Sequence, residues 1–159
     1  MEIYLLRHGA AEPRTEGIAD ENRALTRAGR RGVQAVLQRA RAAIVKPALI
    51  FTSSLIRARE TAEITQQVLR SGELVETPAL LPDVSPSVLW TEIGAHHGIK
   101  ALVIVGHQPQ LSRLAALLLE AAVLIDFKKG AMARISVRGN HPPRGVLHWI
   151  ITPQLVGGK

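Results

Sequence analysis

Three short hydrophobic runs of this chain each lead into side chains that could do chemistry. The first run ends in Arg7 and His8, the third ends just before His107, and Arg57 follows the second by about one helical turn. Two guanidinium groups and two imidazoles form a set of positive charges and hydrogen-bond donors with no carboxylate among them. Such a set suits a dianion, and phosphate is the obvious one.

The elements that must position these side chains alternate along the chain between strand and helix patterns. We expect strands over residues 3–6, 48–52, 74–77, 101–106, 133–138 and 146–151. We expect helices from Thr26 onward, over residues 54–70, over about 87–97, and from Pro109 to about 122. This order predicts an α/β fold, a three-layer sandwich with a mainly parallel central sheet flanked by helices.

Particular residues suggest where the helices begin and end. We expect Thr26 to cap the first helix, Pro47 to close that segment, and Ser54 to begin the second helix. The hydrophobic residues of the first helix recur at helical spacing, at Val33, Leu37, Ala40 and Ile44. Residues 10–25 are polar and irregular, and they read as a loop.

The carboxyl ends of the predicted strands give the chemical residues a common location. Ligands of open α/β sheets bind outside the carboxyl ends of the strands. If the strands that end at His8 and His107 are both central and parallel, both imidazoles lie at the same edge of the sheet. The sequence therefore predicts one phosphate-binding cleft that contains Arg7, His8, Arg57 and His107.

Four motifs, each near the end of a predicted element, resemble those of a known family. They are "LLRHGAAE", "RALT" followed by Gly29, "SSLIRARETA" and "VGHQPQLS". In this order they resemble the histidine phosphatase superfamily, which has the phosphoglycerate-mutase-like fold, and the short chain is most similar to its SixA-type phosphohistidine phosphatases. Ala24 and Ser54 stand where the family usually has proline.

The resemblance implies a role for each residue of the cleft. His8 would be the nucleophile that becomes phosphohistidine, and the Gly9 carbonyl is a plausible partner that would fix its tautomer. Arg7 and Arg57 would clamp the phosphate oxygens, and His107 would be a further donor. Arg23 could reach the cleft or be structural, whereas Arg59 reads as a surface or structural residue.

The general acid of many superfamily members has no clear counterpart here. Position 10, beside the "RHG" motif, is alanine, and the two acidic candidates are Glu12 and Asp83. No segment is long enough for a separate lid domain, so we expect an open cleft. An open cleft suits a phosphate displayed on a protein better than a small metabolite that needs enclosure.

Composition limits the partners and the compartment. The chain has 159 residues, a net charge of +7 and no cysteine. Its length favours one domain, residues 1–159, and the lack of cysteine suits a reducing cytoplasm. The charge suits an anionic partner, but only 3% of the residues are aromatic, so we expect no nucleic acid. We also expect no membrane partner, because the longest apolar stretch, Leu114–Ile125, contains Glu120 and is short of a membrane span.

We expect neither a metal ion nor another cofactor. The motifs contain no carboxylate cluster for a divalent ion. His96 and His97 are neighbours on a predicted helix and do not share a face, so they read as helix-end residues.

Three hypotheses on function remain open at this point. The first is a phosphatase that hydrolyses phosphohistidine on a protein through phosphorylated His8. The second is a small-molecule phosphomonoesterase of the same fold, acting on a phosphorylated metabolite. The third is a non-catalytic phosphate-dependent binding protein or a basic nucleic-acid module. A general acid near the phosphate would favour the second hypothesis over the first.

Overall fold

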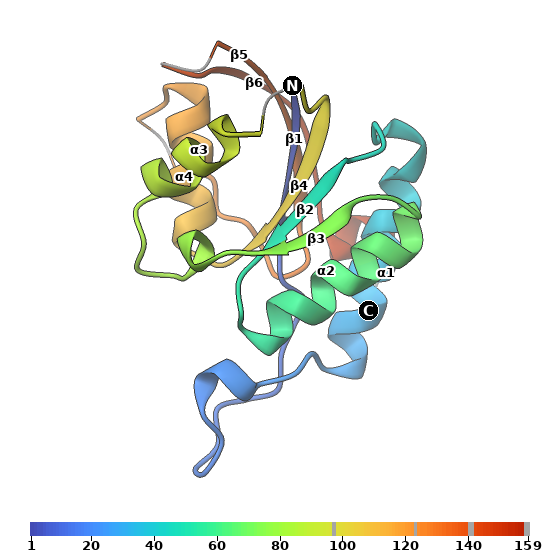
Figure 1. The fold of residues 1–159 in the computed structure, drawn as a ribbon. Coiled ribbons are helices and arrows are strands. Elements are labelled where there is room, and N and C mark those ends of the chain that lie inside the picture. Colours follow the sequence, from blue (N-terminus) through green and yellow to red (C-terminus); the bar gives the residue numbers. More distant parts are fainter. Residues whose placement is uncertain (97, 123, 140–141, 158–159) are drawn as a thin grey trace.

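The computed structural model describes residues 1–96, 98–122, 124–139 and 142–157, and its centre is one six-stranded sheet (Figure 1). The spatial order of the strands is β3-β2-β4-β1-β5-β6. Their bounds are β1 (Glu2–Arg7), β2 (Leu49–Thr52), β3 (Glu73–Glu76), β4 (Ala101–Gly106), β5 (Met132–Arg138) and β6 (Arg144–Ile151).

The sheet is parallel on one side and antiparallel on the other. Strands β3, β2, β4 and β1 pair in parallel, whereas β5 and β6 run antiparallel to their neighbours. The predicted mainly parallel sheet is confirmed, and the structure adds two antiparallel pairings at β5 and β6. In the register of the central pair, Arg7 lies opposite Gly106. The residues that follow, His8 and His107, therefore leave the sheet side by side.

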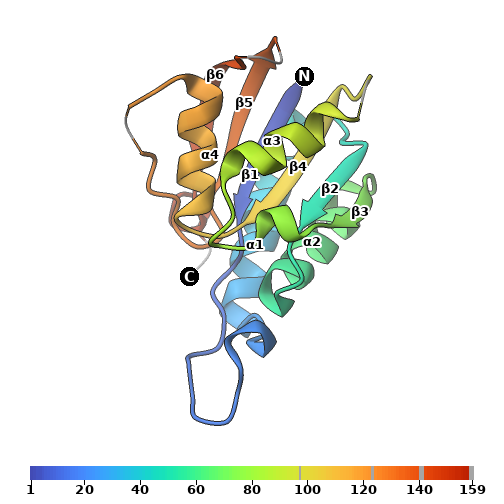
Figure 2. The same ribbon diagram turned by 60° about the vertical axis from the view of Figure 1, so that its left-hand side comes forward.

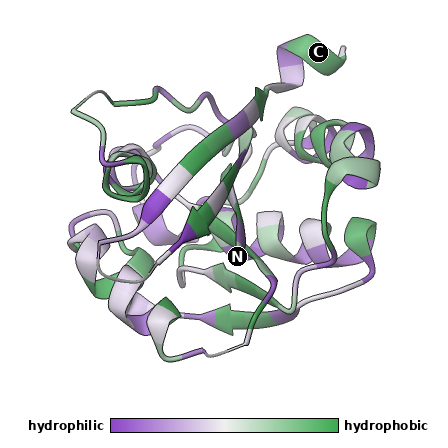
Figure 3. Cartoon of the chain, turned by 90° about the horizontal axis from the view of Figure 1, so that it is seen from above, coloured by the Kyte–Doolittle hydropathy of each residue, from purple (hydrophilic) through white to green (hydrophobic). Residues whose placement is uncertain are grey.

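Helices cover both faces of the sheet and complete a three-layer sandwich (Figures 1 and 2). Helices α1 (Arg27–Ala40) and α2 (Ile56–Leu69) lie on one face, and α3 (Pro86–Gly94) and α4 (Gln110–Leu119) lie on the other. Seen from above, the strands run between the two helical layers and carry many hydrophobic residues (Figure 3). None of the helices in the described part of the chain is long and apolar enough to cross a membrane.

Strand β1 shows why the sheet is buried on both faces. Its side chains alternate between the faces, as in any strand. Ile3 and Leu5 join the core under α3 and α4, and Tyr4 and Leu6 join the core under α1 and α2. All four side chains are fully buried. Apolar burial of this kind is the main stabilisation of the fold, and it fixes the strand end from which His8 projects.

The ends of several helices differ from the prediction. Thr26 caps α1 as predicted, and its hydroxyl oxygen accepts from the Gly29 amide at 2.9 Å. The α-helix ends at Ala40, however, and a 3-10 turn over residues 41–43 leaves Ile44 outside it. Tightening of a final helical turn is common and shortens the α-helix that periodicity suggests. Ser54 does not begin α2, because the capping residue is Leu55, which makes no side-chain capping bond.

Helices α3 and α4 are also shorter than predicted. Helix α3 ends at Gly94, so His96 lies beyond it, and its ring contacts Phe51 edge-on with 5.5 Å between ring centroids. His97 lies outside the described residues. Helix α4 ends at Leu119, where Glu120 adopts a left-handed backbone, and Pro109 caps the helix rather than occupying its first turn. A left-handed residue ends an α-helix, which periodicity alone does not reveal.

Candidate active site

The four residues predicted to share a cleft do line one cleft. Arg7, His8, Arg57 and His107 all border a cavity of about 270 Å³ at the carboxyl ends of β1 and β4. The two imidazole rings lie 5.0 Å apart, measured between centroids. The neighbouring parallel strands bring them together, as the sequence pattern indicated. We call this cavity the phosphate cleft.

The His8 ring is held by a main-chain group on one side. Its Nδ1 atom lies 2.7 Å from the Gly9 carbonyl oxygen. Because a carbonyl can only accept, Nδ1 must donate, and Nε2 is left with a free lone pair. The Gly9 amide in turn donates to the Thr61 hydroxyl at 3.2 Å, which ties this turn to α2.

Burial keeps the His8 ring neutral. The ring is almost completely buried, and desolvation lowers its pKa to about 4, with the nearby cations of Arg57, Arg7 and Lys129 adding to the effect. The hydrogen bond with Gly9 acts in the opposite direction and is outweighed. A neutral ring with a fixed Nδ1 proton is the form of histidine that can attack phosphorus.

Glycine is required at position 9 because the first helix approaches closely. A Cβ atom there would lie 2.8 Å from the Gly29 carbonyl oxygen and 2.9 Å from a methyl group of Val33. The backbone of α1 leaves no room for a side chain at this turn. Gly9 of the "RHG" motif and Gly29, which follows "RALT", therefore pack against each other. The sequence alone shows them only as parts of two separate motifs.

Arg7 is anchored beside His8. Its Nη1 atom donates to the Phe127 carbonyl at 2.6 Å, whereas its buried Nε has no hydrogen-bond partner among the described residues. Desolvation lowers the pKa of Arg7, although Asp126 acts to raise it. The ordinary pKa of a guanidinium group is so high that Arg7 stays charged at neutral pH.

Arg57 makes its contacts with a residue that the sequence analysis missed. Its two terminal nitrogens donate to Asp20, Nη1 to the main-chain carbonyl at 2.7 Å and Nη2 to the carboxylate at 2.9 Å. Asp20 thereby occupies the end of the guanidinium group. The buried Nε has no partner among the described residues.

Asp20 is the carboxylate of the phosphate cleft, and arginines surround it. Its Oδ1 also accepts from Arg23 at 2.9 Å and from Arg14 at 3.1 Å. Desolvation acts to raise the pKa of Asp20, but hydrogen bonds from Arg23 and Arg57 outweigh it and bring the pKa to about 2. Asp20 is therefore ionised at neutral pH. The one sequence signal was its position three residues before Arg23, in the polar loop.

His107 is oriented by a second residue that the sequence analysis missed. Its Nε2 atom lies 2.7 Å from the Ser53 hydroxyl, and its buried Nδ1 has no partner among the described residues. If Ser53 donates to Nε2, Nδ1 carries the proton and can donate to an anion. Desolvation lowers the pKa of His107 to about 3, and His8 and Arg57 lower it further. Ser53 stands in the "SSLIRARETA" motif, but nothing in the motif shows which way its hydroxyl points.

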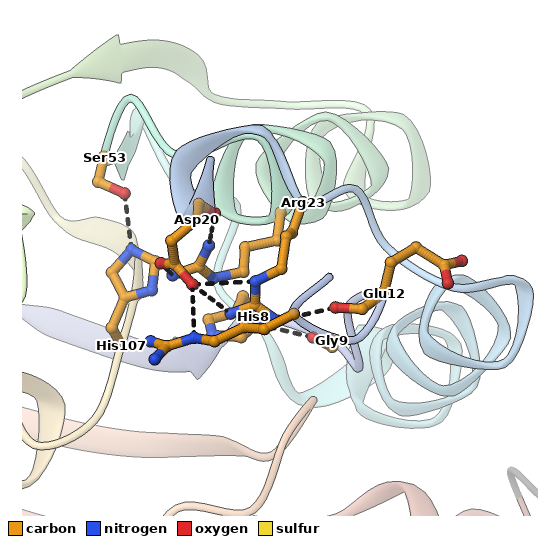
Figure 4. A network of polar contacts seen from close by, with 9 residues as sticks. His8, Gly9, Glu12, Asp20, Arg23, Ser53 and His107 are labelled. Carbon is orange, nitrogen blue, oxygen red and sulfur yellow. Dashed lines mark hydrogen bonds and ion pairs between the residues drawn. The ribbon is translucent and has the colours of Figure 1, made fainter. Parts of the chain in front are cut away.

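Among the remaining predicted residues, Arg23 lines the phosphate cleft and the other three do not. Glu12 is exposed, and its side chain points away from His8 (Figure 4). Asp83 is exposed, and like Glu12 it is absent from the lining of the phosphate cleft. Arg23 does line it, and it holds the loop by donating to the Glu12 carbonyl at 2.8 Å. Arg59 pairs with Glu76 at the surface, as predicted.

A metal site is not formed by the side chains described. Within the described ranges, no group of three or more His, Asp or Glu side chains comes together in a way that could hold a metal ion. The positive charge of the phosphate cleft comes from guanidinium and ammonium groups of the chain itself.

Comparison with known proteins gives a consistent picture. The family model of the histidine phosphatase superfamily (branch 1) matches residues 3–81. An uncharacterized protein of Picosynechococcus sp. is 36% identical over 121 residues, which cover 72% of this chain and 71% of that protein.

Two solved structures illustrate the likeness in fold. The protein histidine phosphatase SixA, in complex with tungstate, has a TM-score of 0.88 at 21% identity and covers 98% of this chain and 99% of its own. The alpha-ribazole phosphatase of Shigella flexneri has a TM-score of 0.73 at 18% identity, covering 96% of this chain and 97% of its own. At these identities the likeness shows a shared fold.

Proposed function

The chain belongs to the histidine phosphatase superfamily and is a phosphatase, and we propose that its substrate is phosphohistidine on another protein. One observation carries the proposal. The phosphate cleft contains a poised nucleophile and several cations, but its carboxylate is ionised and engaged by arginines. The cleft therefore binds phosphate well and protonates a leaving group poorly.

The first step transfers the phosphoryl group to His8. The Nε2 lone pair attacks phosphorus as the bond from phosphorus to the substrate imidazole breaks, and the electron pair of that bond leaves with the imidazole. Arg7, Arg57 and His107 supply donors for the charge on the phosphoryl oxygens. The Gly9 carbonyl holds the Nδ1 proton and stabilises the positive charge that forms on the His8 ring.

The second step returns the enzyme to its starting state. A water molecule attacks the phosphorus of phosphorylated His8, the bond from phosphorus to Nε2 breaks, and inorganic phosphate leaves. His8 is again neutral, with its proton on Nδ1. The same cations serve both steps, because the phosphoryl oxygens keep their places while the group on the far side of phosphorus changes.

The leaving group decides between substrate classes. An alkyl phosphate releases an alkoxide, whose conjugate acid has a pKa near that of water, about 15.7, so its departure benefits greatly from a proton donor. Phosphohistidine protonated on its ring releases neutral imidazole, whose conjugate acid has a pKa of about 6.5. With Asp20 at a pKa of about 2 and neither Glu12 nor Asp83 at the cleft, the imidazole is the easier leaving group.

The similarity to SixA supports the same choice. The structure most like this one in the comparison above is a protein histidine phosphatase holding tungstate, a tetrahedral oxyanion. The alpha-ribazole phosphatase shares the fold at a lower TM-score. A partner protein is also the substrate that suits an open cleft of about 270 Å³.

The test compares kcat/KM for four substrates that each carry a phosphoryl group but differ in the leaving group. These are a phosphohistidine peptide, a phosphoserine peptide, a sugar phosphate and an activated aryl phosphate. We expect the phosphohistidine peptide to be best and the aryl phosphate intermediate. Equal or better efficiency on the alkyl phosphates would assign the chain to small-molecule phosphomonoesterases. Binding of all four without turnover would make it a phosphate-dependent binding protein.

A further inference from the structure

A second cavity opens beside the phosphate cleft. It has a volume of about 450 Å³ and shares two lining residues with the cleft, Arg7 and Lys129. We call it the side pocket. None of the chemistry described above uses it. It is larger than the phosphate cleft, whose volume is about 270 Å³. The two cavities are therefore neighbours at Arg7 and Lys129.

The residues of α1 that line the side pocket have small side chains or none. On one side lie Ala28, Gly29 and Gly32 of the first turns of α1. A Cβ added at Gly32 would meet nothing closer than Pro153, at 3.4 Å, which is ordinary contact. No long side chain projects from this face of the helix. The pocket is therefore open to a side chain supplied by another molecule.

The opposite wall is basic and rigidly joined to the nucleophile. Residues 128–131 form a turn in which the Ala131 amide donates to the Lys128 carbonyl at 2.9 Å. The Gly130 amide donates to the carbonyls of Arg7 and His8, at 3.2 and 3.1 Å. These main-chain bonds fix the turn against the end of β1. Lys129 is thereby placed between the phosphate cleft and the side pocket.

The two lysines of this turn differ in their pairing. Lys128 forms an ion pair with Asp126 at 2.5 Å. For Lys129, no ion pair with a carboxylate is present among the residues that the structure describes. The side pocket thus has an unneutralised ammonium group at its boundary, in a chain with a net charge of +7. Charge complementarity calls for an anionic occupant.

We propose that the side pocket binds an acidic residue that lies close to the phosphohistidine of the substrate protein, with Lys129 as its cationic partner. This inference rests on the proposed function and narrows its substrate class to acidic protein surfaces. The carboxylate pairs with Lys129, while the methylene groups of an Asp or Glu side chain lie against the small residues of α1. Recognition then depends on two anions of one substrate, the phosphate and the neighbouring carboxylate.

The experiment compares two phosphohistidine peptides that differ only in Glu or Gln at the positions flanking the histidine. Because Lys129 is exposed and an ion pair at an exposed side chain contributes little, we expect wild-type kcat/KM to favour the Glu peptide by up to about fivefold. An activated aryl phosphate, which has no flanking residue, normalises each variant for damage to the phosphate cleft.

Two variants test the two halves of the proposal. Lys129→Gln removes the charge, and Gly32→Leu fills the pocket from the helix without changing any charge. In both, the Glu-to-Gln preference should fall to about one. Gly32 is buried and faces Pro153, so a melting curve checks that Gly32→Leu remains folded. Lys46→Gln, an exposed lysine outside both cavities, is the matched control and should keep the preference.

The outcomes separate the two proposals. Wild-type enzyme that hydrolyses both peptides equally well, or a preference that survives in both variants, would overturn the side-pocket assignment and leave the phosphohistidine substrate in place. Turnover of the aryl phosphate with no turnover of either phosphohistidine peptide would overturn the proposed function and this inference with it.

Discussion

The candidate active site is built from two regions that the fold holds differently. His8 and His107 follow adjacent central strands and are 7% and 3% exposed. Arg14 and Asp20 lie on the loop between β1 and α1, where the Arg14 side chain is 80% exposed. Main-chain groups fix His8, whereas ion pairs between side chains hold the loop residues. In the proposed mechanism, the strand ends supply the nucleophile, and the loop adjusts the charge around it.

The largest effect should come from the strand ends. Replacing the nucleophile in His8→Gln should lower kcat/KM by at least about 1,000-fold, since removing a covalent nucleophile commonly costs that much or more. Rapid quench with labelled substrate should place acid-labile, base-stable label on His8 of the wild-type enzyme.

Arg14→Gln is the matched change on the loop, and it should lower kcat/KM by less than about threefold, as expected for an exposed ion pair. Label on another residue, or comparable losses in the two variants, would show that the strand ends and the loop are not divided in this way.

Arg57 joins the two regions, and its shape should matter more than its charge. Arg57→Lys keeps the charge but cannot contact Asp20 and a phosphate oxygen at once with fixed geometry. We expect kcat/KM to fall about 100-fold, the typical cost of one lost transition-state donor. Steady-state kinetics with the aryl phosphate and a melting curve measure activity and folding separately.

Arg59→Lys is the control for that change, because Arg59 lies on the same helix but pairs with Glu76 at the surface. It should behave as wild type. Wild-type kinetics in Arg57→Lys would mean that Arg57 does not contact the phosphate.

The two regions also differ in how far the sequence predicts them. Hydrophobic runs followed by histidine identify β1 and β4, and their parallel pairing follows from the alternation of strands and helices. Side-chain contacts between distant segments produce no comparable pattern in the sequence. Asp20 meets Arg57 across 37 positions of the chain, and Ser53 meets His107 across 54. Their partners depend on the path of a loop and on side-chain rotamers, which local patterns do not encode.

Helix ends show the same limit on a smaller scale. Ile44 fits the helical spacing of Val33, Leu37 and Ala40, yet the chain leaves the α-helix before it. Periodicity reports which residues face the core. It does not report whether the last turn is α-helical or 3-10, because both conformations can bury the same side chain.

The buried histidines should make the free energy of unfolding depend on pH. This dependence should fall in a pH range in which Asp20 does not titrate. The folded-state pKa values of His8 and His107 are about 4 and 3, below the ordinary 6.5. Below pH 6.5 the unfolded chain therefore binds protons at these two histidines, whereas the folded chain does not. As a result, the free energy of unfolding falls as the pH drops toward 4. Each histidine should contribute a slope of up to about 1.4 kcal/mol per pH unit.

Urea unfolding at pH values from 7.5 to 4.5 measures this slope. His107→Gln should reduce it, and His148→Gln, which changes an exposed histidine of β6, should not. Asp20 contributes below this window, because its carboxylate loses stabilising contacts only as the pH falls from 3.8 toward about 2. A slope unchanged in His107→Gln would mean that His107 titrates normally in the folded protein.

The smallest effect should come from the charge of the loop. Asp20 lies in the phosphate cleft as an anion, so it repels a phosphate dianion while it holds Arg57. Asp20→Asn removes the charge but keeps the main-chain carbonyl that accepts from Arg57 and an amide oxygen in place of the carboxylate. A unit charge at 4 Å in water is worth about 1 kcal/mol, so inorganic phosphate should inhibit this variant about fivefold more tightly.

The comparison with Asp20→Ala separates two effects of Asp20, the repulsion of phosphate and the positioning of Arg57. Alanine removes the same charge but also the side-chain acceptor of Arg57, so any gain in phosphate affinity should be smaller than in Asp20→Asn. Asp83→Asn, which removes a carboxylate outside the cleft, should leave inhibition by phosphate within about twofold of wild type, because water and salt screen distant charges. Weaker phosphate binding in Asp20→Asn would reverse the assignment: the carboxylate would then serve mainly to hold Arg57 in place, and the loop would supply geometry as well as charge.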